Sequence, residues 1–397
     1  MSSSLSLEKL VVQPPITANS IKNFDQSTVA RDAEETRIIV HARFPELAGR
    51  FLEHKRARGS QHEKSLYATD KTFTWKDLVT RLIEKRPLVF MNGTDHTMLR
   101  DGTKPKGRTT TEWDRNGTDE QHLNKYLTLE KYLSYDEIML GSLIGVSSPS
   151  YFINDGNRYN QGQEGKAGTF QPRGVIIGLV GARFERDDRM DSVYMLAKAD
   201  NPHQDPRLTG IFEDFFGAKR HPEADFDSGM YKGRIRITVD MLLLEADARA
   251  KQAAKTAYTY VVGLGLGVWQ YHNKQAEYYI DTFATAIEEL RLPNTSTIEF
   301  AWITAPKACQ SRVSRAAEKK DIKVIFSKRN PAEKLANDEE LLVLSYAWDG
   351  NAFPGNEYWE GSLTASGDPA AACMSTIGEL HNPVVNPFTK RITVLGR

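Results

Sequence analysis

The chain contains very little cysteine, with only Cys309 and Cys373 among 397 residues. Two thiols cannot build a disulfide framework, and their separation in the sequence does not match the ligand spacing of a zinc site. This scarcity is typical of proteins from a reducing compartment. We therefore expect a cytoplasmic protein, or an effector that works in a cytosol, without a cysteine-bound metal, rather than a disulfide-stabilised secreted protein.

Long apolar runs and an excess of one charge are also missing. No stretch approaches the roughly 18 apolar residues needed to cross a bilayer, and the first residues lack the basic and apolar segments of a secretory signal. The 52 Lys and Arg residues balance the 52 Asp and Glu residues. One basic stretch, residues 50–64, is interpreted as a solvated helix end. We therefore expect neither a membrane nor a nucleic acid as partner.

The order of elements predicts three parts. Residues 1–35 are polar with little periodicity, which is typical of a poorly ordered or loosely docked arm. Residues 36–150 form a mainly helical N-terminal region, with a helix after Thr74 and another over 128–146. Residues 151–397 alternate between strands and helices, which predicts an α/β domain whose mixed sheet has helices on both faces. Its predicted strands cover 174–184, 258–262, 297–304, 322–326 and 341–346, its helices cover 275–290, 311–320 and the segment after Asp368, and another strand is predicted to begin at 234.

A glycine-rich segment, GLGLGVW at 263–269, follows one predicted strand and precedes a helix. Bare backbone amides at such a turn can cradle a phosphate. The dinucleotide-binding pattern needs its third glycine at 268, which is valine, and no Gly-Lys-Ser/Thr of a Walker loop follows. We predict a diphosphate-binding loop, and a tight turn without a ligand remains the alternative. The predicted ligand-binding residues are Gly263, Gly265, Leu266, Gly267, Val268 and Trp269.

A second segment, WDGNAFPGNEYW at 348–359, follows the strand predicted over 341–346. Ligands of open α/β sheets bind beyond the carboxyl ends of strands, where both segments lie. A diphosphate-binding loop beside a cluster of carboxylates suggests a site for a nucleotide sugar. Hydrolysis of a glycosidic bond to ribose passes through an oxocarbenium-like state, and carboxylates can stabilise its positive charge or activate the attacking water. A loop of turn-forming residues, with Asp368 capping a helix, is the alternative. The predicted catalytic residues are Asp349, Glu357 and Asp368, and Asn351 and Asn356 are predicted to bind the ligand.

A third polar segment, NDGNRYN at 154–160, offers Asp155 and Arg158. An acid there could recognise the edge of an adenine, and the arginine could stack or pair with phosphate. Arg183 follows a predicted strand and is a further candidate for ligand binding. The alternatives are an Asx turn at 154–160 and an internal ion pair between Arg183 and Glu185.

These segments carry a family resemblance. NDGNRYNQG, GLVGARFE, GLGLGVWQ and WDGNAFPGNEYW with SGDPAAA, in this order, resemble the branch of macrodomain-like ADP-ribosylhydrolases that includes the Legionella effector MavL and its eukaryotic relatives. The match covers roughly residues 150–397. It implies an ADP-ribose pocket in a macrodomain-like sheet whose motif order is rearranged, because the acidic loop follows the phosphate loop. The resemblance also implies removal of ADP-ribose from a protein side chain.

Members of this branch are associated with ADP-ribosyl-arginine, including modified ubiquitin, and with acidic residues rather than a required metal. Carried over, the acids are Asp349, Glu357 and Asp368, although the family pattern can carry Asp where this chain has Glu357. The sequence thus predicts a hydrolase with no cofactor, and Mg²⁺ stays open because clustered carboxylates also bind it. A reader module that binds ADP-ribose without cleaving it is the main alternative, and an NAD-consuming transferase is a third.

Overall fold

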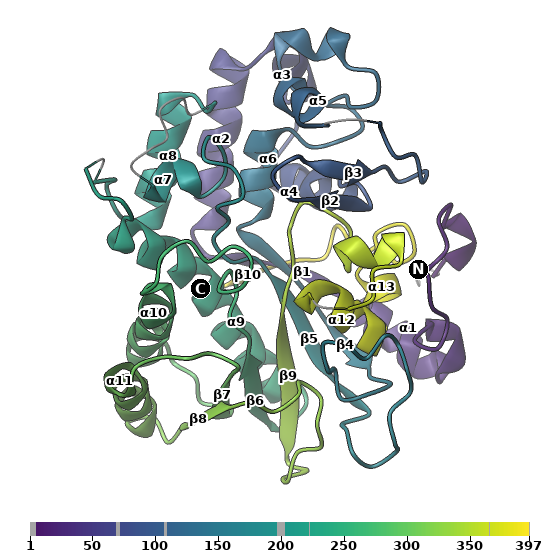
Figure 1. Ribbon diagram of the computed structural model, residues 1–397, viewed down its shortest axis with the longest axis vertical. Helices are drawn as coiled ribbons and strands as arrows, with labels where there is room; N and C mark the ends of the chain where they lie inside the picture. Colours follow the sequence, from purple (N-terminus) through teal and green to yellow (C-terminus); the bar gives the residue numbers. More distant parts are fainter. Residues whose placement is uncertain are drawn as a thin grey trace.

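An eight-stranded sheet forms the centre of the computed structural model, which describes residues 5–68, 72–106, 109–196, 203–221, 223–364 and 366–396 (Figure 1). The strand order is β10-β1-β4-β5-β9-β6-β7-β8. Strands β5, β9, β6, β7 and β8 run parallel, whereas β4 is antiparallel to both of its neighbours. The α/β fold with a mixed sheet is therefore confirmed. The strands are β1 Arg37–His41, β4 Ile144–Tyr151, β5 Arg173–Leu179, β6 Thr256–Val261, β7 Thr295–Ala301, β8 Lys323–Ser327, β9 Glu340–Ala347 and β10 Ile392–Leu395.

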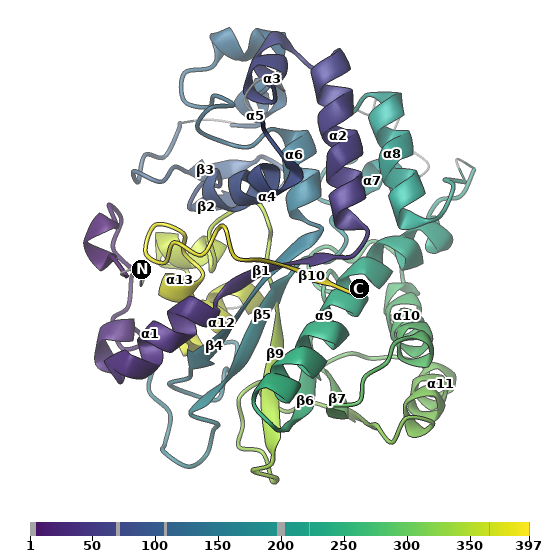
Figure 2. The ribbon, with the colours of Figure 1, turned by 180° about the vertical axis from the view of Figure 1, so that it is seen from behind.

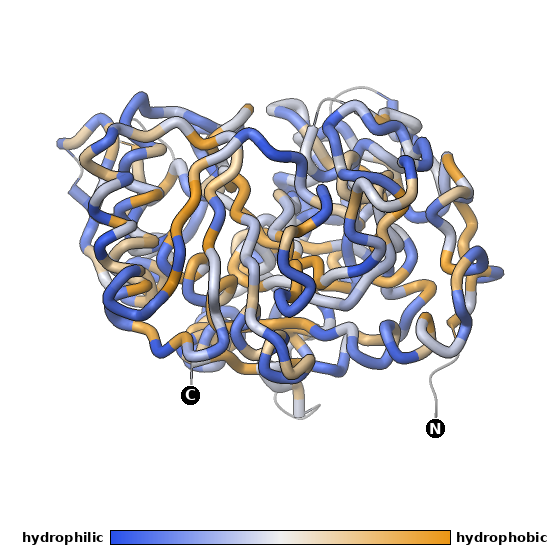
Figure 3. The backbone as a smooth tube through the Cα atoms, turned by 90° about the horizontal axis from the view of Figure 1, so that it is seen from below, coloured by the Kyte–Doolittle hydropathy of each residue, from blue (hydrophilic) through white to orange (hydrophobic). Residues whose placement is uncertain are grey.

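Helices cover both faces of this sheet, which is why its central strands are nearly continuous apolar runs. Helices α9 Ser228–Gln252, α10 Gln275–Glu289 and α11 Lys307–Glu318 lie on the face shown in Figure 2. Helices α12 Gly367–Met374 and α13 Ile377–Leu380 lie on the opposite face (Figure 1). In Figure 3, apolar stretches of the chain gather in the interior between polar segments.

A cap of helices and a short hairpin lies beyond the carboxyl ends of the parallel strands, at the top of Figure 1. The helix predicted after Thr74 is confirmed as α4, where Thr74 and Asp77 form a capping box. The cap consists of α2 Phe44–Arg58, α3 Gln61–Leu66, α4 Trp75–Glu84, β2 Val89–Met91, β3 His96–Met98, α5 Thr110–Arg115, η4 Asp119–Leu123, α6 Tyr135–Gly141, α7 Ser192–Met195 and α8 Pro206–Phe216.

Two element predictions are wrong. The helix predicted over 128–146 is shorter, because Ser134 caps α6 at its start and the chain enters strand β4 at Ile144. The strand predicted to begin at 234 lies inside the 25-residue helix α9. That helix buries side chains around much of its circumference, so its sequence has no clear helical periodicity and its apolar run resembles a buried strand.

The sheet takes strands from both sides of the predicted boundary near residue 150, because β1 and β4 precede it. Residues 1–35 are predicted as a poorly ordered or loosely docked arm. Residues 1–4 lie outside the described residues, and the rest of the arm forms η1 Leu7–Lys9, η2 Ile21–Asn23 and α1 Gln26–Glu35. This segment docks on α12 and α13, where the Asn19 amide donates to the carbonyl of Ala372. The division into separate folding units stays a prediction. In the described residues no helix combines the length and apolar character required to cross a bilayer.

Candidate active site

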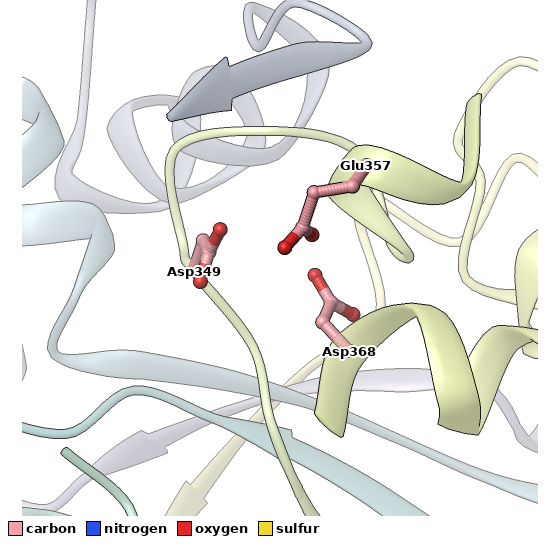
Figure 4. A group of neighbouring side chains, drawn as sticks. All are labelled: Asp349, Glu357 and Asp368. Atoms are coloured by element: carbon pink, nitrogen blue, oxygen red, sulfur yellow. The ribbon is translucent and has the colours of Figure 1, made fainter. Parts of the chain in front are cut away.

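Three carboxylates meet in the loop that joins β9 to α12. One oxygen from each of Asp349, Glu357 and Asp368 lies within 4.8 Å of the others (Figure 4). Asp349 follows the end of β9 by two residues, Glu357 lies in the short helix η5 Asn356–Glu360, and Asp368 lies in the first turn of α12. The three acids predicted from the sequence therefore share one site.

Hydrogen bonds within the chain fix the shape of this acidic loop. The Asp368 carboxylate accepts from the amide of Gly355 at 2.8 Å, and Gly355 itself has a φ of 94° that favours glycine. Ser366, rather than Asp368, occupies the N-cap position of α12. Asp368 therefore connects the acidic loop to α12 through the Gly355 amide. It does not cap α12, which was the alternative considered from the sequence.

The two asparagines of the loop have different surroundings. The Asn356 side chain accepts from the Phe90 amide at 2.9 Å and donates to the Phe90 carbonyl at 3.0 Å and to the Asp349 carboxylate. Asn351 is also fully buried, but its Oδ1 and Nδ2 have no hydrogen-bond partner among the described residues. Because unpaired buried amides are costly, Asn351 has hydrogen-bonding capacity left for a ligand or water, and its contact with a ligand stays a prediction. Asn356 instead anchors the loop on strand β2.

Burial and mutual repulsion raise the pKa values of the three acids. Burial raises the pKa of Asp349 from 3.8 to about 7, with Arg183 opposing this shift and Glu357 adding to it. Burial followed by the charges of Asp349 and Glu357 raises the pKa of Asp368 well above its ordinary value. The pKa of Glu357 is raised as well, chiefly by burial. Because neighbouring carboxylates cannot all ionise cheaply, the group holds protons near neutral pH, as proton transfer requires.

This electrostatic arrangement predicts a pH dependence of stability. A carboxyl group with a raised folded-state pKa binds more protons in the folded than in the unfolded chain between the two pKa values. Its contribution to stability is therefore present at low pH and is lost as the pH rises from about 4 to about 7. Urea unfolding of wild-type protein and Asp349→Asn across this range should show a less negative slope of stability against pH for the variant. Parallel slopes would contradict the assigned pKa.

Arg183 connects the acidic loop to the glycine-rich loop. Its Nη1 donates to the Asp349 carbonyl at 3.0 Å, and its Nη2 pairs with the Glu185 carboxylate at 2.5 Å. Its guanidinium carbon also lies 4.6 Å from the centre of the Trp269 ring, whose indole hydrogen-bonds the same Glu185 carboxylate. The internal ion pair considered from the sequence is therefore present. The same contacts bring Trp269 and Asp349 to one side of the molecule.

The glycine-rich loop lies between the carboxyl end of β6 and helix α10. Gly265 has a φ of 76° and backs onto the neighbouring loop so closely that a Cβ would lie 2.8 Å from the Ala182 carbonyl. Gly267 and Val268 face solvent, with Val268 97 % exposed. Within the described chain, the amides of Gly267, Val268 and Trp269 donate no hydrogen bond. They are free to receive an anion, as the sequence predicts for this loop.

Gly263 and Leu266 pack closely against each other within this turn. A Cβ on Gly263 would lie 3.1 Å from the Leu266 Cβ. Leu266 is partly buried against the core, and Trp269 is almost fully buried. Their contacts with a ligand stay predictions.

A small recess of about 10 Å³ opens beside the acidic loop. Many of the residues that line this recess lie outside the sequence motifs. Several of them come from the helical cap. Tyr135 of α6 lies beneath the guanidinium groups of Arg186 and Arg189, at 5.2 and 4.6 Å from its ring centre. The one sequence signal for these lining residues is the arginine-rich segment ARFERDDR after β5. The lining residues are Phe90, Asp95, Tyr135, Ile138, Arg183, Glu185, Arg186, Arg189, Met190 and Asn351.

Asp155 and Arg158 are not brought to the acids. Their loop follows β4 and packs beside the carboxyl end of α12, where a Cβ on Gly156 would lie 2.5 Å from the Met374 sulfur. Asp155 accepts from the Asn157 amide and from the Asn330 side chain, so the Asx turn considered from the sequence is present. Arg158 is exposed. Because the acids lie at the amino end of α12, this loop would not reach the same part of a ligand.

Comparison with known proteins gives a consistent result over nearly the whole chain. The family model for MavL-like ADP-ribosylhydrolases matches residues 8–205 and 198–392. The ADP-ribosylarginine hydrolase CG2909 of Drosophila melanogaster is 35% identical over 416 aligned residues, which cover 93% of this chain and 81% of the relative. The ADP-ribosylarginine hydrolase CG3568 of the same species is 36% identical over 394 residues, covering 88% of this chain and 75% of the relative.

Proposed function

Because the chain belongs to the MavL-like ADP-ribosylhydrolase family, we propose that it removes ADP-ribose from modified arginine side chains of proteins. The observation that carries this proposal is the group of three acids beside the recess, tied through Arg183 to the glycine-rich loop. Such an arrangement offers an anion-binding turn and proton-carrying acids side by side. The names of the two insect relatives support arginine as the modified residue.

In the proposed reaction, water attacks the anomeric carbon of the distal ribose. The bond from that carbon to the arginine nitrogen breaks and its electron pair stays on the nitrogen. The neutral guanidine that leaves takes up the proton lost by the water, from the acid that received it, and becomes the guanidinium of unmodified arginine. Asp349 and Asn351 position the ribose, while Glu357 or Asp368 takes the proton of the attacking water. The products are ADP-ribose and unmodified arginine. The backbone amides of residues 267–269 hold the diphosphate.

A hydrolysis assay separates this activity from the two alternatives. Wild-type protein is incubated with an arginine-ADP-ribosylated protein, and released ADP-ribose is measured by mass spectrometry beside calorimetric binding of ADP-ribose. We expect both release and binding. Binding without release would mean a reader module, and consumption of added NAD would mean a transferase or an NAD hydrolase.

Divalent cations provide a second chemistry that three carboxylates can support. We propose that protons, rather than a cation, offset the crowded negative charge, because the family resemblance implies acidic residues without a required metal. Turnover should therefore persist after dialysis against EDTA and assay in chelator. Loss of turnover that Mg²⁺ restores would show that a cation takes the place of the shared proton.

The identity of the modified protein is a finer proposal. The family resemblance favours arginine-modified ubiquitin, so the rate of release should be higher from that substrate than from another arginine-modified protein of similar size. Equal rates would indicate that the enzyme recognises only the ADP-ribosyl-arginine unit. The cytoplasmic location inferred from the scarcity of cysteine also stays a prediction.

A further inference from the structure

One large aromatic side chain on the rim of the sheet has no role in the site described above. Trp302, the first residue after β7, is 61 % exposed, whereas the indoles of Trp269 and Trp348 are buried. Its φ of 59° lies in the left-handed region, which a bulky side chain rarely adopts. Strained backbone of this kind persists only where the surrounding structure holds it, and it clusters at ligand sites.

The position of Trp302 follows from the strand order. Strands β9, β6 and β7 are neighbours and parallel, so their carboxyl ends lie along one edge. Val261 pairs with Phe300, and extending this register by two residues sets Gly263 opposite Trp302. Along that edge the order is acidic loop, glycine-rich loop and Trp302. Adjacent strands are separated by about 4.8 Å, so the edge from β9 to β7 spans about 10 Å.

The indole ring is also held in place. Its Nε1 donates to the Arg329 carbonyl at 3.0 Å, and the Tyr260 hydroxyl donates to the same carbonyl at 2.7 Å. Arg329 is itself fixed by a 2.8 Å ion pair with the buried carboxylate of Glu299. The indole is therefore exposed but restricted by a hydrogen bond. Such a side chain loses little conformational entropy when a flat ligand stacks on its face.

A ligand as large as ADP-ribose extends beyond the recess, because a volume of about 10 Å³ lies far below the usual range of roughly 300–1,000 Å³ for small-molecule sites. With the ribose at the acids and the diphosphate on the glycine-rich loop, the nucleoside has to continue along the edge. The next feature there is Trp302. The loop of Asp155 and Arg158, which the sequence suggested for the adenine, lies away from the acids, and Asp155 accepts a hydrogen bond from Asn330, the neighbour of the Arg329 that holds Trp302.

We propose that Trp302 is the stacking platform for the adenine of the substrate. This proposal rests on the proposed function for the orientation of the ligand, with the distal ribose at the acids. Stacking of a base on an aromatic side chain does not depend strongly on which base it is. The distance between the adenine and the acids is set by the diphosphate bound to the glycine-rich loop. Trp302 is then a binding and specificity residue that takes no part in proton transfer.

Tryptophan fluorescence tests the stacking without requiring turnover. AMP should quench the emission of wild-type protein, and Trp302→Phe should remove this quenching because its exposed indole is gone. Trp75→Phe, which changes a partly buried tryptophan in the cap, should keep it. Ribose 5-phosphate, which has no base, should quench neither protein. Equal quenching of wild-type protein and Trp302→Phe by AMP, or no quenching of wild-type protein, would overturn the proposal.

Kinetics on an arginine-ADP-ribosylated protein provide the second readout. Trp302→Ala should raise KM on the order of tenfold and leave kcat unchanged, whereas Trp302→Phe should stay close to wild type. An unchanged KM in Trp302→Ala, with a change of oligomeric state in ultracentrifugation, would instead assign the exposed ring to a protein contact and overturn the proposal. Absence of any ADP-ribose release from wild-type protein would count against the proposed function, while AMP quenching would still decide the stacking.

Discussion

Asp349→Asn should lower kcat for release of ADP-ribose from modified arginine by about 100- to 10,000-fold. The substitution keeps the size of the side chain and removes the carboxylate whose pKa burial raises to about 7. An amide can neither carry the proton nor stabilise positive charge on the ribose. Affinity for ADP-ribose should stay within a small factor of wild type, because the glycine-rich loop is untouched.

Single-turnover hydrolysis and calorimetry on the same preparation would measure both quantities. Asp338→Asn is a matched control, because this acid is exposed, pairs with Lys334 and precedes the amino end of β9, at the edge opposite to the acids. It should behave as wild type. Full activity of Asp349→Asn would remove Asp349 from the catalytic account.

Arg183→Met should weaken both binding and folding. The guanidinium joins the Asp349 carbonyl, the Glu185 carboxylate and the face of Trp269, so its loss separates the two loops that line the site. It also leaves a largely buried Glu185 without its charge partner. Removing one partner of a buried ion pair costs about 3 kcal/mol or more of stability. We also expect Kd for ADP-ribose to rise about tenfold or more, since the anion-binding turn loses its support.

Arg183→Lys separates charge from geometry in this experiment. A lysine keeps the positive charge that lowers the pKa of Asp349. It cannot contact the Asp349 carbonyl and the Glu185 carboxylate at once, and it cannot stack on Trp269. The pH profile of kcat should therefore stay near that of wild type in Arg183→Lys and move to higher pH in Arg183→Met. Chemical denaturation, calorimetry and pH–rate profiles would check these effects. Wild-type affinity and stability in Arg183→Met would show that the two loops are held independently.

The parts of the site that the sequence could predict are those close together in the chain. Asp349 and Glu357 lie eight positions apart in one loop, and Asp368 follows at the start of the next helix, so only short-range structure had to be inferred. The glycine-rich loop was recognisable for the same reason, because a buried strand precedes it and an amphipathic helix follows. General knowledge of where α/β sheets bind ligands then placed both loops at one edge.

Long-range packing explains what the sequence could not predict. Phe90 and Tyr135 line the recess although more than 200 positions separate them from the acidic loop, and no local pattern encodes that contact. The separation of Asp155 from the acids has a topological cause, and its contact with a ligand stays a prediction. Strand β4 was not recognised, and because it runs antiparallel to β5, the turn that follows it lies at the amino ends of the parallel strands. Polarity alone could not show which edge of the sheet that turn occupies.

The most direct test of the account is a crystal structure of Asp349→Asn with bound ADP-ribose. We predict the distal ribose beside Glu357, Asp368 and Asn351, with the diphosphate on the amides of residues 267–269. ADP-ribose bound elsewhere on the molecule, or bound with its diphosphate away from the glycine-rich loop, would contradict the claim that the two loops form one active site.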